Sequence, residues 1–252
     1  MADSMPWILR AAAPVAAIPP RLRLYCFCYA GGSAAAYLPW QAALDPAIEL
    51  CAIQLPGRAS RLMEAPASSM APLVETLVDV LQAQPPGPFA FFGHSLGALL
   101  AFEVARHCQA TGRATPLHLV VSGCEAPQQR ATGRRLHALP HDELIEALKE
   151  YNGTPPEVLA HAELMTLLMP AIRSDFALAE TYRYHAGPPL RMPVTMLCGR
   201  SDDHVAPGQM AGWELETQGQ GRLHCFDGDH FFIHSSRTAV LACLNTTLAA
   251  AA

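Results

Sequence analysis

The sequence predicts an α/β fold, in which a mainly parallel central sheet is flanked by helices and interrupted by a helical insertion. Apolar stretches typical of buried strands alternate with stretches of helical periodicity over residues 21–123, and again after Pro193. Between these regions, residues 125–185 show helical patterns and no candidate strand. Because no linker or internal repeat divides the 252 residues, we expect one domain over residues 1–252, with the insertion at about 125–185.

Four strands and two helices are expected before the insertion. Residues 69–84 place Leu73, Leu77 and Leu81 on one face, as an amphipathic helix does. A second helix is expected over residues 98–112, where Gly112 can end it. The strand candidates are rich in aliphatic and aromatic residues and end close to Gly or Pro; they are residues 21–30, 48–55, 88–93 and 116–123.

The second half of the chain is expected to be helical first and then alternating again. The longer helical stretch of the insertion contains two leucines and two methionines, which can pack on the core, line an acyl pocket, or do both, because a helix has two faces: Leu164, Met165, Leu168 and Met169. The expected helices of the insertion lie at residues 141–150 and 163–184; after it, strands at 193–199 and 222–228 alternate with helices at 209–218 and 237–250.

The composition indicates a well-packed protein without a nucleic-acid or membrane partner. Apolar residues make up 51% of the chain and charged residues 15%, with a net charge of −5 and no Lys/Arg cluster that would follow phosphates. No apolar run approaches the roughly 18 residues of a membrane span. Asp3, Arg10 and Pro14 interrupt the N-terminal segment, so we expect no signal peptide. The eight cysteines lie in apolar surroundings, which predicts buried free thiols and a cytoplasmic protein.

One short motif points to chemistry. Residues 93–97 read Gly-His-Ser-Leu-Gly and stand between an expected strand and an expected helix. This is the order of a nucleophile elbow, a turn so sharp that the serine takes a strained backbone conformation. Side chains at Gly93 or Gly97 would collide with the neighbouring strand and helix, and the N-terminus of the helix favours negative charge beside the serine. The alternative reading, a plain turn serine, does not explain these flanking elements.

A serine nucleophile needs a histidine base and a carboxylate that orients the base, in the chain order serine, acid, histidine. Asp202 comes three residues after the strand that ends at Gly199, and His230 comes after the last strand. The sequence therefore predicts Ser95, Asp202 and His230 as catalytic residues. Asp203 is the alternative acid; we favour Asp202 because the acid sits at the immediate end of its strand in this architecture.

Other histidines near these positions have different expected roles. His94 lies inside the elbow and is expected to pack beside the site, and His224 belongs to a strand. His230 and His234 could form a metal-binding pair, but no HExxH motif and no clustered cysteine or carboxylate ligands accompany them. We therefore expect no metal site, and we expect Asp229 to be a turn residue.

Acyl chemistry at a serine also needs two backbone N–H groups that bind the developing oxyanion. One belongs to the residue after the nucleophile, Leu96, and the other comes from the loop after an early strand. That loop contains Gly31 and Gly32, which let the backbone approach closely, and we expect Ala30 to provide the second N–H group. A simple glycine turn is the alternative.

Seven motifs follow one another along the chain: FCYAGGSAAAYLPW, IQLPGRASRLMEAP, FFGHSLGALLAFEVAR, VVSGCEAP, GTPPEVL, LMPAIRSDFALAETYRY and FDGDHFFI. Together they resemble a known family, the type II thioesterases that accompany nonribosomal peptide and polyketide synthases. The resemblance runs from about Leu22 to the last helix, and a relative is the medium-chain thioesterase of animal fatty acid synthesis.

The resemblance implies the α/β-hydrolase fold with a helical lid, and it assigns Ser95, Asp202 and His230 as triad with Ala30 and Leu96 as oxyanion donors. It also implies hydrolysis of thioesters on the phosphopantetheine arm of carrier proteins, with no cofactor. We expect a monomer whose partners are acyl or peptidyl carrier protein domains. The chain departs from the family pattern at three places. It has Cys28-Tyr29 where the family commonly has Pro-His, it has RSDF where RADF is commoner, and it has Leu96 where Met is frequent.

Two other functions stay open at this point. The chain could be a general serine carboxylesterase or an acyl-CoA thioesterase, which relative rates on oxoesters and carrier-bound thioesters would show. It could also be a degenerate hydrolase that only binds acyl carriers. The complete set of Ser95, Asp202 and His230 argues against a non-catalytic protein.

Overall fold

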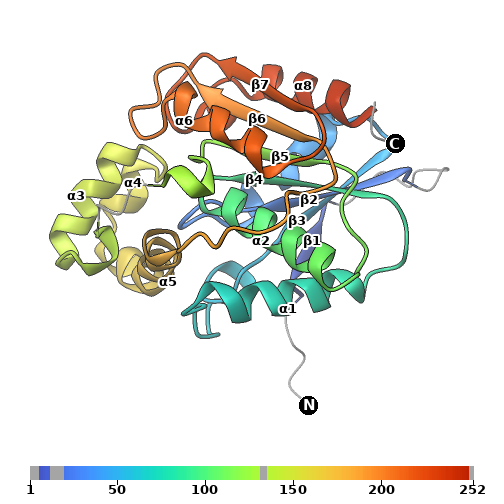
Figure 1. Cartoon of the computed structure of the whole chain (residues 1–252). Helices are drawn as coiled ribbons and strands as arrows, with labels where there is room; N and C mark the ends of the chain where they lie inside the picture. Colours follow the sequence, from blue (N-terminus) through green and yellow to red (C-terminus); the bar gives the residue numbers. More distant parts are fainter. Residues whose placement is uncertain (1–5, 12–19, 131–134, 250–252) are drawn as a thin grey trace.

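A computed structural model describes residues 6–11, 20–130 and 135–249 of the chain. These residues form a seven-stranded sheet in the order β1-β3-β2-β4-β5-β6-β7 (Figure 1). Neighbouring strands pair in parallel, except that β1 is antiparallel to β3, so the predicted mainly parallel sheet is confirmed. The strands are β1 (Ile8–Arg10), β2 (Leu22–Phe27), β3 (Ile48–Ile53), β4 (Phe89–His94), β5 (Leu119–Ser122), β6 (Val194–Gly199) and β7 (Gly221–Phe226).

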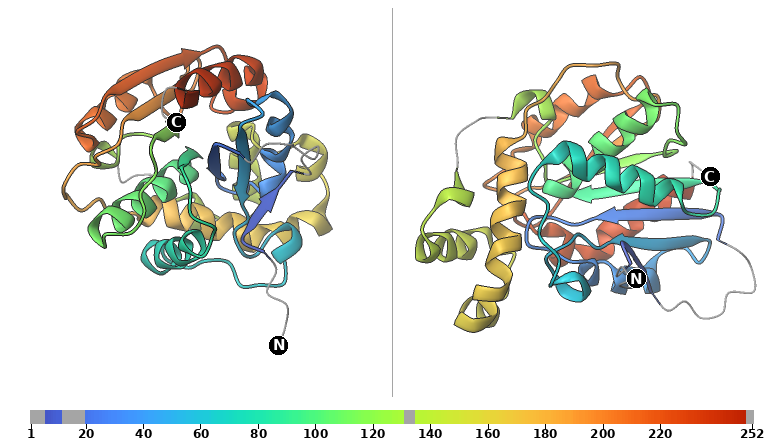
Figure 2. Two further views of the ribbon diagram at one scale, coloured as in Figure 1. Left: turned by 90° about the vertical axis from the view of Figure 1, so that its right-hand side faces the viewer. Right: turned by 90° about the horizontal axis from the view of Figure 1, so that it is seen from below.

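Helices cover both faces of the sheet (Figure 2). One face packs against α1 (Met70–Gln82), α2 (Leu96–Ala110) and α6 (Pro207–Ala211), and the other against α7 (Phe232–Ser235) and α8 (Arg237–Ala249). Side chains alternate along each strand, so Phe91 of β4 joins the first core and Phe92 joins the second. Within the described residues, no helix has the length and the apolar character needed to cross a membrane.

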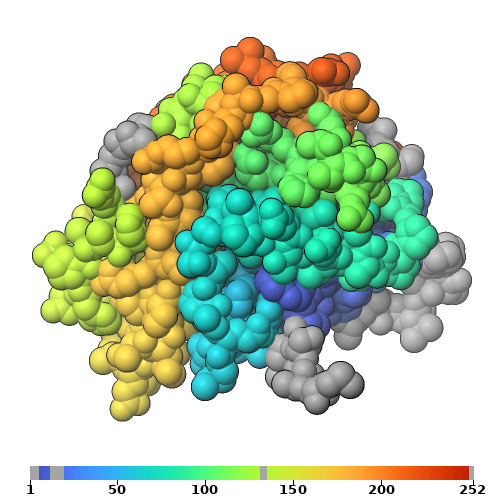
Figure 3. Space-filling model, turned by 60° about the horizontal axis from the view of Figure 1, so that its bottom comes forward, coloured from blue at the N-terminus to red at the C-terminus, as the bar shows by residue number. Residues whose placement is uncertain are grey.

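The helical insertion lies between β5 and β6, where the sequence predicted it. It contains α3 (His141–Tyr151), α4 (Pro156–Leu159) and α5 (Ala162–Thr181), and α5 runs across the end of the sheet (Figure 2). In the space-filling view, these helices form one end of the molecule (Figure 3). They share a small core of their own, in which Met165 and Met169 pack with Leu144 and Leu148. The two methionines therefore pack inside the insertion.

Some elements differ from the sequence-based expectation. The strand β1 was missed, because three residues are too short to show an alternating pattern. The expected helix at residues 209–218 is instead the short α6 followed by the 3-10 helix η6 (Gly212–Glu216). Three 3-10 helices follow β2 and β3 in loops without helical periodicity; they are η1 (Ala34–Ala36), η2 (Leu38–Ala43) and η3 (Ala59–Arg61). The insertion also holds η4 (Pro127–Gln129) and η5 (Leu136–Ala138).

The prediction of free thiols is wrong for two cysteines. Cys198 of β6 and Cys225 of β7 stand opposite each other in the parallel register and are joined as a disulfide, with their Cα atoms 4.7 Å apart. The two cysteines are 27 residues apart in the chain, so no short sequence motif predicts their pairing. The other cysteines are free, and of these all but Cys243 are buried.

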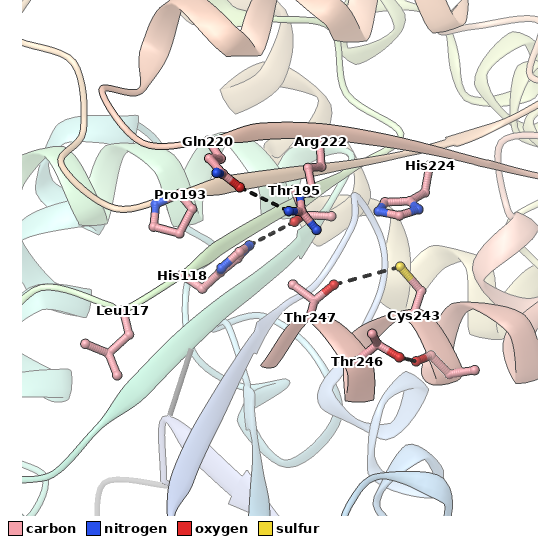
Figure 4. Close-up of a pocket in the computed structure, with 11 residues that line it drawn as sticks. Leu117, His118, Pro193, Thr195, Gln220, Arg222, His224, Cys243, Thr246 and Thr247 are labelled. Carbon is pink, nitrogen blue, oxygen red and sulfur yellow. Dashed lines mark hydrogen bonds between the residues drawn. The ribbon is translucent and has the colours of Figure 1, made fainter. Parts of the chain in front are cut away.

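A hollow of about 730 Å³ lies where β5, β6 and β7 begin, next to the second half of α8 (Figure 4). His118 faces Thr195 in this hollow, and their side chains are joined by a hydrogen bond of 2.9 Å between Nε2 and Oγ1. Burial, and to a smaller degree the charge of Arg222, lowers the pKa of His118 to about 4. The folded chain therefore keeps this ring neutral at a pH where the unfolded chain would protonate it.

We expect this histidine to make the fold sensitive to acid. With a pKa of about 4 in the folded chain and about 6.5 in the unfolded chain, the folded state binds fewer protons between these two values. The free energy of unfolding therefore carries no penalty from His118 above about pH 6.5. As the pH falls from 6.5 to about 4, it decreases by about 1.4 kcal/mol per pH unit. Denaturant titrations at pH 7 and pH 4.5 measure how much the free energy of unfolding decreases between these two pH values. This decrease should be smaller for His118→Gln than for the unmodified chain, by roughly 2 kcal/mol.

His224→Gln is the matched control, because His224 lines the same hollow but is exposed. If the free energy of unfolding decreased equally in His118→Gln and in the unmodified chain, His118 would not be a source of the acid sensitivity.

Candidate active site

Ser95 stands at the turn between β4 and α2, with φ 54° and ψ −118°. The positive φ is the strained conformation that the sequence predicted for this residue. Both glycines of the motif are sterically required: a Cβ on Gly93 would collide with the carbonyl group of Gly97, and one on Gly97 with the carbonyl group of Phe27. The turn therefore lifts the Ser95 side chain above the end of the sheet and directs the N-terminus of α2 toward it.

His230 and Asp202 come from the loops after β7 and β6, and they are in contact. The Nδ1 atom of His230 lies 2.8 Å from Oδ2 of Asp202, and their side chains are 4% and 0% exposed. The other oxygen of Asp202 accepts hydrogen bonds from the backbone N–H groups of His204 and Val205 at 2.8 and 3.0 Å. Asp203, the alternative acid, is exposed. Of the two adjacent aspartates, Asp202 is the one bonded to His230.

These contacts also decide the charge of Asp202. Burial raises the pKa of this carboxyl group, but the hydrogen bond and charge of His230 and the two backbone N–H donors outweigh burial, and they hold the pKa below its ordinary value. Asp202 is thus an anion at neutral pH, and it fixes the proton of His230 on Nδ1. The other ring nitrogen, Nε2, is then left to act as a base.

Ser95 and His230 line one cavity of about 630 Å³ at the carboxyl ends of the strands. Ala30 and Leu96 line it as well, so both expected oxyanion residues lie beside the serine. As the first residue of α2, Leu96 has an N–H group without an acceptor inside the helix. The structure brings together the five residues that the sequence singled out, four at the cavity wall and Asp202 behind His230.

The helical insertion forms one wall of this cavity. The wall residues of the insertion include Tyr151 of α3 and Phe176, Ala179 and Glu180 of α5. Residues after β5 and β6 also line the cavity; among them are Gly123, Glu125 and Asp203. The lining of the cavity thus combines apolar side chains with several charged ones, most of them acidic.

Two other histidines near the site, His94 and His234, have structural surroundings. His94 is buried, its Nδ1 lies 2.9 Å from Oγ of Ser122, and its ring centroid is 5.0 Å from that of His230. Burial, together with the charges of His230 and His234, lowers the pKa of His94 well below its ordinary value, so this ring is neutral. His234 lies 3.2 Å from the Tyr29 hydroxyl through Nε2. Among the described residues, no group of three or more His, Cys, Asp or Glu side chains is arranged to hold a metal ion.

Sequence reasoning missed one buried ion pair beside the site. Asp175 of α5 is 1% exposed and bonds Arg58 in the loop after β3, through Oδ1 to Nη2 at 2.8 Å. Burial opposes the charge of Arg58, but Asp175 leaves the pKa of the guanidinium raised above its ordinary value. A charged residue next to the apolar Phe176 in a helix was the available signal.

Comparisons with known proteins agree with this geometry. Residues 22–248 match the thioesterase domain family. The gramicidin S biosynthesis protein GrsT of Aneurinibacillus migulanus is 39% identical over 217 residues, which cover 86% of this chain and 85% of that protein. The structure of BorB, a type II thioesterase from the borrelidin biosynthetic cluster, is 39% identical, with a TM-score of 0.85 over 96% of this chain and 98% of BorB. RedJ, a thioesterase from the prodiginine biosynthetic pathway in Streptomyces coelicolor, is 36% identical, with a TM-score of 0.84 over 94% of this chain and 96% of RedJ.

Proposed function

The chain belongs to the thioesterase domain family, and on that premise we propose that it hydrolyses acyl or aminoacyl thioesters on the phosphopantetheine arm of carrier proteins. Its role would be to clear misloaded groups from nonribosomal peptide or polyketide synthases. The similarity to GrsT and BorB, which are named for such biosynthetic systems, supports this assignment. The observation that carries the chemistry is Ser95 in its strained turn, at a cavity shared with the His230 that is bonded to Asp202.

The first half of the proposed reaction transfers the acyl group to the serine. Nε2 of His230 takes the hydroxyl proton of Ser95, and Oγ attacks the thioester carbonyl carbon. The N–H groups of Ala30 and Leu96 stabilise the oxyanion of the tetrahedral intermediate. The carbon–sulfur bond then breaks, and His230 returns the proton to the departing pantetheine sulfur. Asp202 keeps the imidazole in the correct tautomer and stabilises the imidazolium ion.

The second half releases the acyl group to water. A water molecule attacks the acyl-enzyme carbonyl carbon while His230 removes its proton, and the same two N–H groups hold the oxyanion. The bond to Ser95 Oγ breaks, the proton returns to the serine, and a carboxylic acid leaves. These steps are acyl and proton transfers, so the proposal requires no cofactor.

We expect the carrier protein itself to contribute to binding. A phosphopantetheine arm is long and thin, so it can reach Ser95 beneath the insertion while the carrier stays outside, and contacts with the carrier surface then add affinity. The value of kcat/KM should be at least about tenfold higher for an acyl group on a carrier protein than for the same group on coenzyme A or a short thiol. Steady-state kinetics with matched acyl groups on the three thiols measure this ratio. Equal efficiency on all three would leave a general thioesterase, and faster cleavage of matched oxoesters would favour a carboxylesterase.

The insertion is proposed to act as a lid that limits the size of the acyl group. Ala179 of α5 lines the cavity, so Ala179→Phe should narrow it. We expect kcat/KM to fall about tenfold or more for long acyl chains and only a few-fold for acetyl. Leu167→Phe is the matched control, because Leu167 lies on the same helix with 56% of its surface exposed. An equal decrease in kcat/KM for short and long acyl chains would show that Ala179 does not determine which acyl-chain lengths are accepted.

A further inference from the structure

The buried pair between Arg58 and Asp175 joins the insertion to the loop after β3, and both side chains also bond the backbone of the loop after β2. Besides the contact from Nη2 to Oδ1, Nη1 of Arg58 lies 2.5 Å from Oδ2 of Asp175, so the pair is bidentate. The same Oδ2 accepts a hydrogen bond of 2.8 Å from the backbone N–H group of Gly31. Arg58 Nη1 also donates to the carbonyl group of Gly32 at 3.2 Å. One carboxylate of α5 therefore holds the loop both directly and through the arginine.

These bonds surround Ala30, the expected oxyanion donor. The backbone N–H group of Gly32 donates to the carbonyl group of Tyr29 at 2.9 Å and closes a turn around Ala30 and Gly31. Gly31 has φ +75°, a conformation that glycine adopts readily and that gives the loop little rigidity of its own. An oxyanion site works only if its donors are held in place before the reaction, within a few tenths of an ångström. The rigidity of this turn must therefore come from its partners, and Asp175 and Arg58 are the two charged ones.

We propose that Asp175 is a positioning residue that fixes the Ala30 peptide for oxyanion binding, and that α5 and the oxyanion loop move as one unit. Asp175 itself is not a catalytic residue, because it is buried and lines neither the cavity of about 630 Å³ nor a smaller one of about 30 Å³ that Ser95 also lines. The inference rests on the proposed function, since it assigns a role within that reaction. It predicts that any displacement of α5 also changes the oxyanion site.

A pair of double variants isolates the bond to Gly31. Replacing Asp175 alone would leave Arg58 as a buried unpaired charge, which is strongly destabilising, whereas replacing both partners is often tolerated. We therefore compare Arg58→Met/Asp175→Asn, which keeps an oxygen acceptor for the Gly31 N–H group, with Arg58→Met/Asp175→Leu, which has none. The two variants have similar volume and the same charge.

We expect kcat to be about tenfold or more lower in the Leu variant than in the Asn variant, with KM little changed, because only transition-state stabilisation differs. A trifluoromethyl ketone, whose tetrahedral adduct with the serine places an oxyanion in the site, should lose affinity in parallel. A non-hydrolysable amide analogue of the substrate should bind both variants equally. A merely structural role would not separate these two inhibitors.

Glu103→Gln is the control, since Glu103 accepts a hydrogen bond of 2.5 Å from the hydroxyl group of Tyr182 at the end of α5 and does not touch the loop. Equal kcat and equal ketone affinity in the two double variants would overturn the inference, while the unmodified chain still cleaves thioesters and the proposed function stands. Loss of the proposed function would instead appear as an unmodified chain that does not cleave thioesters.

Amide hydrogen exchange of the unmodified chain gives a readout that does not depend on the variants folding. The Gly31 amide should exchange only when α5 opens, and therefore with the same protection as the amides around Asp175. Rapid exchange at Gly31 with a protected α5 would also overturn the inference.

Discussion

Ser95→Ala is expected to lower kcat/KM for an acyl thioester by about 10³-fold or more while the protein remains folded. Ser95 supplies the oxygen that becomes acylated in the proposed reaction, and alanine has no atom that can replace it. Both side chains are small and both need the same positive φ, so the melting temperature should change little. The residual rate would come from the oxyanion donors and from substrate binding.

Two measurements test this expectation together. Thioester hydrolysis gives the rate, and labelling with a fluorophosphonate followed by peptide mapping shows whether the reagent attaches to Ser95. Ser201→Ala is the control, because Ser201 is an exposed serine in the loop that also carries Asp202. Near-normal turnover by a folded Ser95→Ala protein would remove the nucleophile assignment, and labelling at another residue would identify its replacement.

The sheet and the serine turn were predictable because both leave strong local signals. Buried parallel strands give continuous apolar runs such as residues 89–93, and the turn at Ser95 tolerates only glycine at two neighbouring positions. The helical insertion was visible as a long stretch without strand patterns. By contrast, β1 is a three-residue strand, and its pairing with β3 depends on tertiary contacts that a short pattern cannot show.

Contacts between distant residues were the part that the sequence could not provide. Arg58 and Asp175 are 117 residues apart, and no sequence motif predicts that they pair with each other. The disulfide between Cys198 and Cys225 depends on the register of two parallel strands, which composition does not reveal. The choice between Asp202 and Asp203 is of the same kind, because adjacent residues on a loop differ only in the direction of their side chains.

That choice leads to the second large effect: Asp202→Asn is expected to lower kcat by roughly 10³- to 10⁴-fold, and Asp203→Asn by no more than a few-fold. Oδ2 of Asp202 lies 2.8 Å from Nδ1 of His230 and accepts a hydrogen bond from the N–H group there. An asparagine can place its N–H group at this position, so the imidazole would take the opposite tautomer, with the proton on Nε2. A protonated Nε2 cannot accept the hydroxyl proton of Ser95. Asp203 is exposed and accepts no such bond, so Asp203→Asn should change kcat little.

Turnover of both variants under saturating thioester gives the ranking, and their stability toward acid gives an independent check. The pKa of Asp202 is lowered in the folded chain, so its contribution to stability is present above the unfolded value of about 3.8 and is lost as the pH falls through the folded value. Asp202→Asn should lack this loss at low pH, whereas Asp203→Asn should retain it. If Asp203→Asn were the slower enzyme, the orienting acid would have to be moved to residue 203, and the contact between His230 and Asp202 would then be structural only.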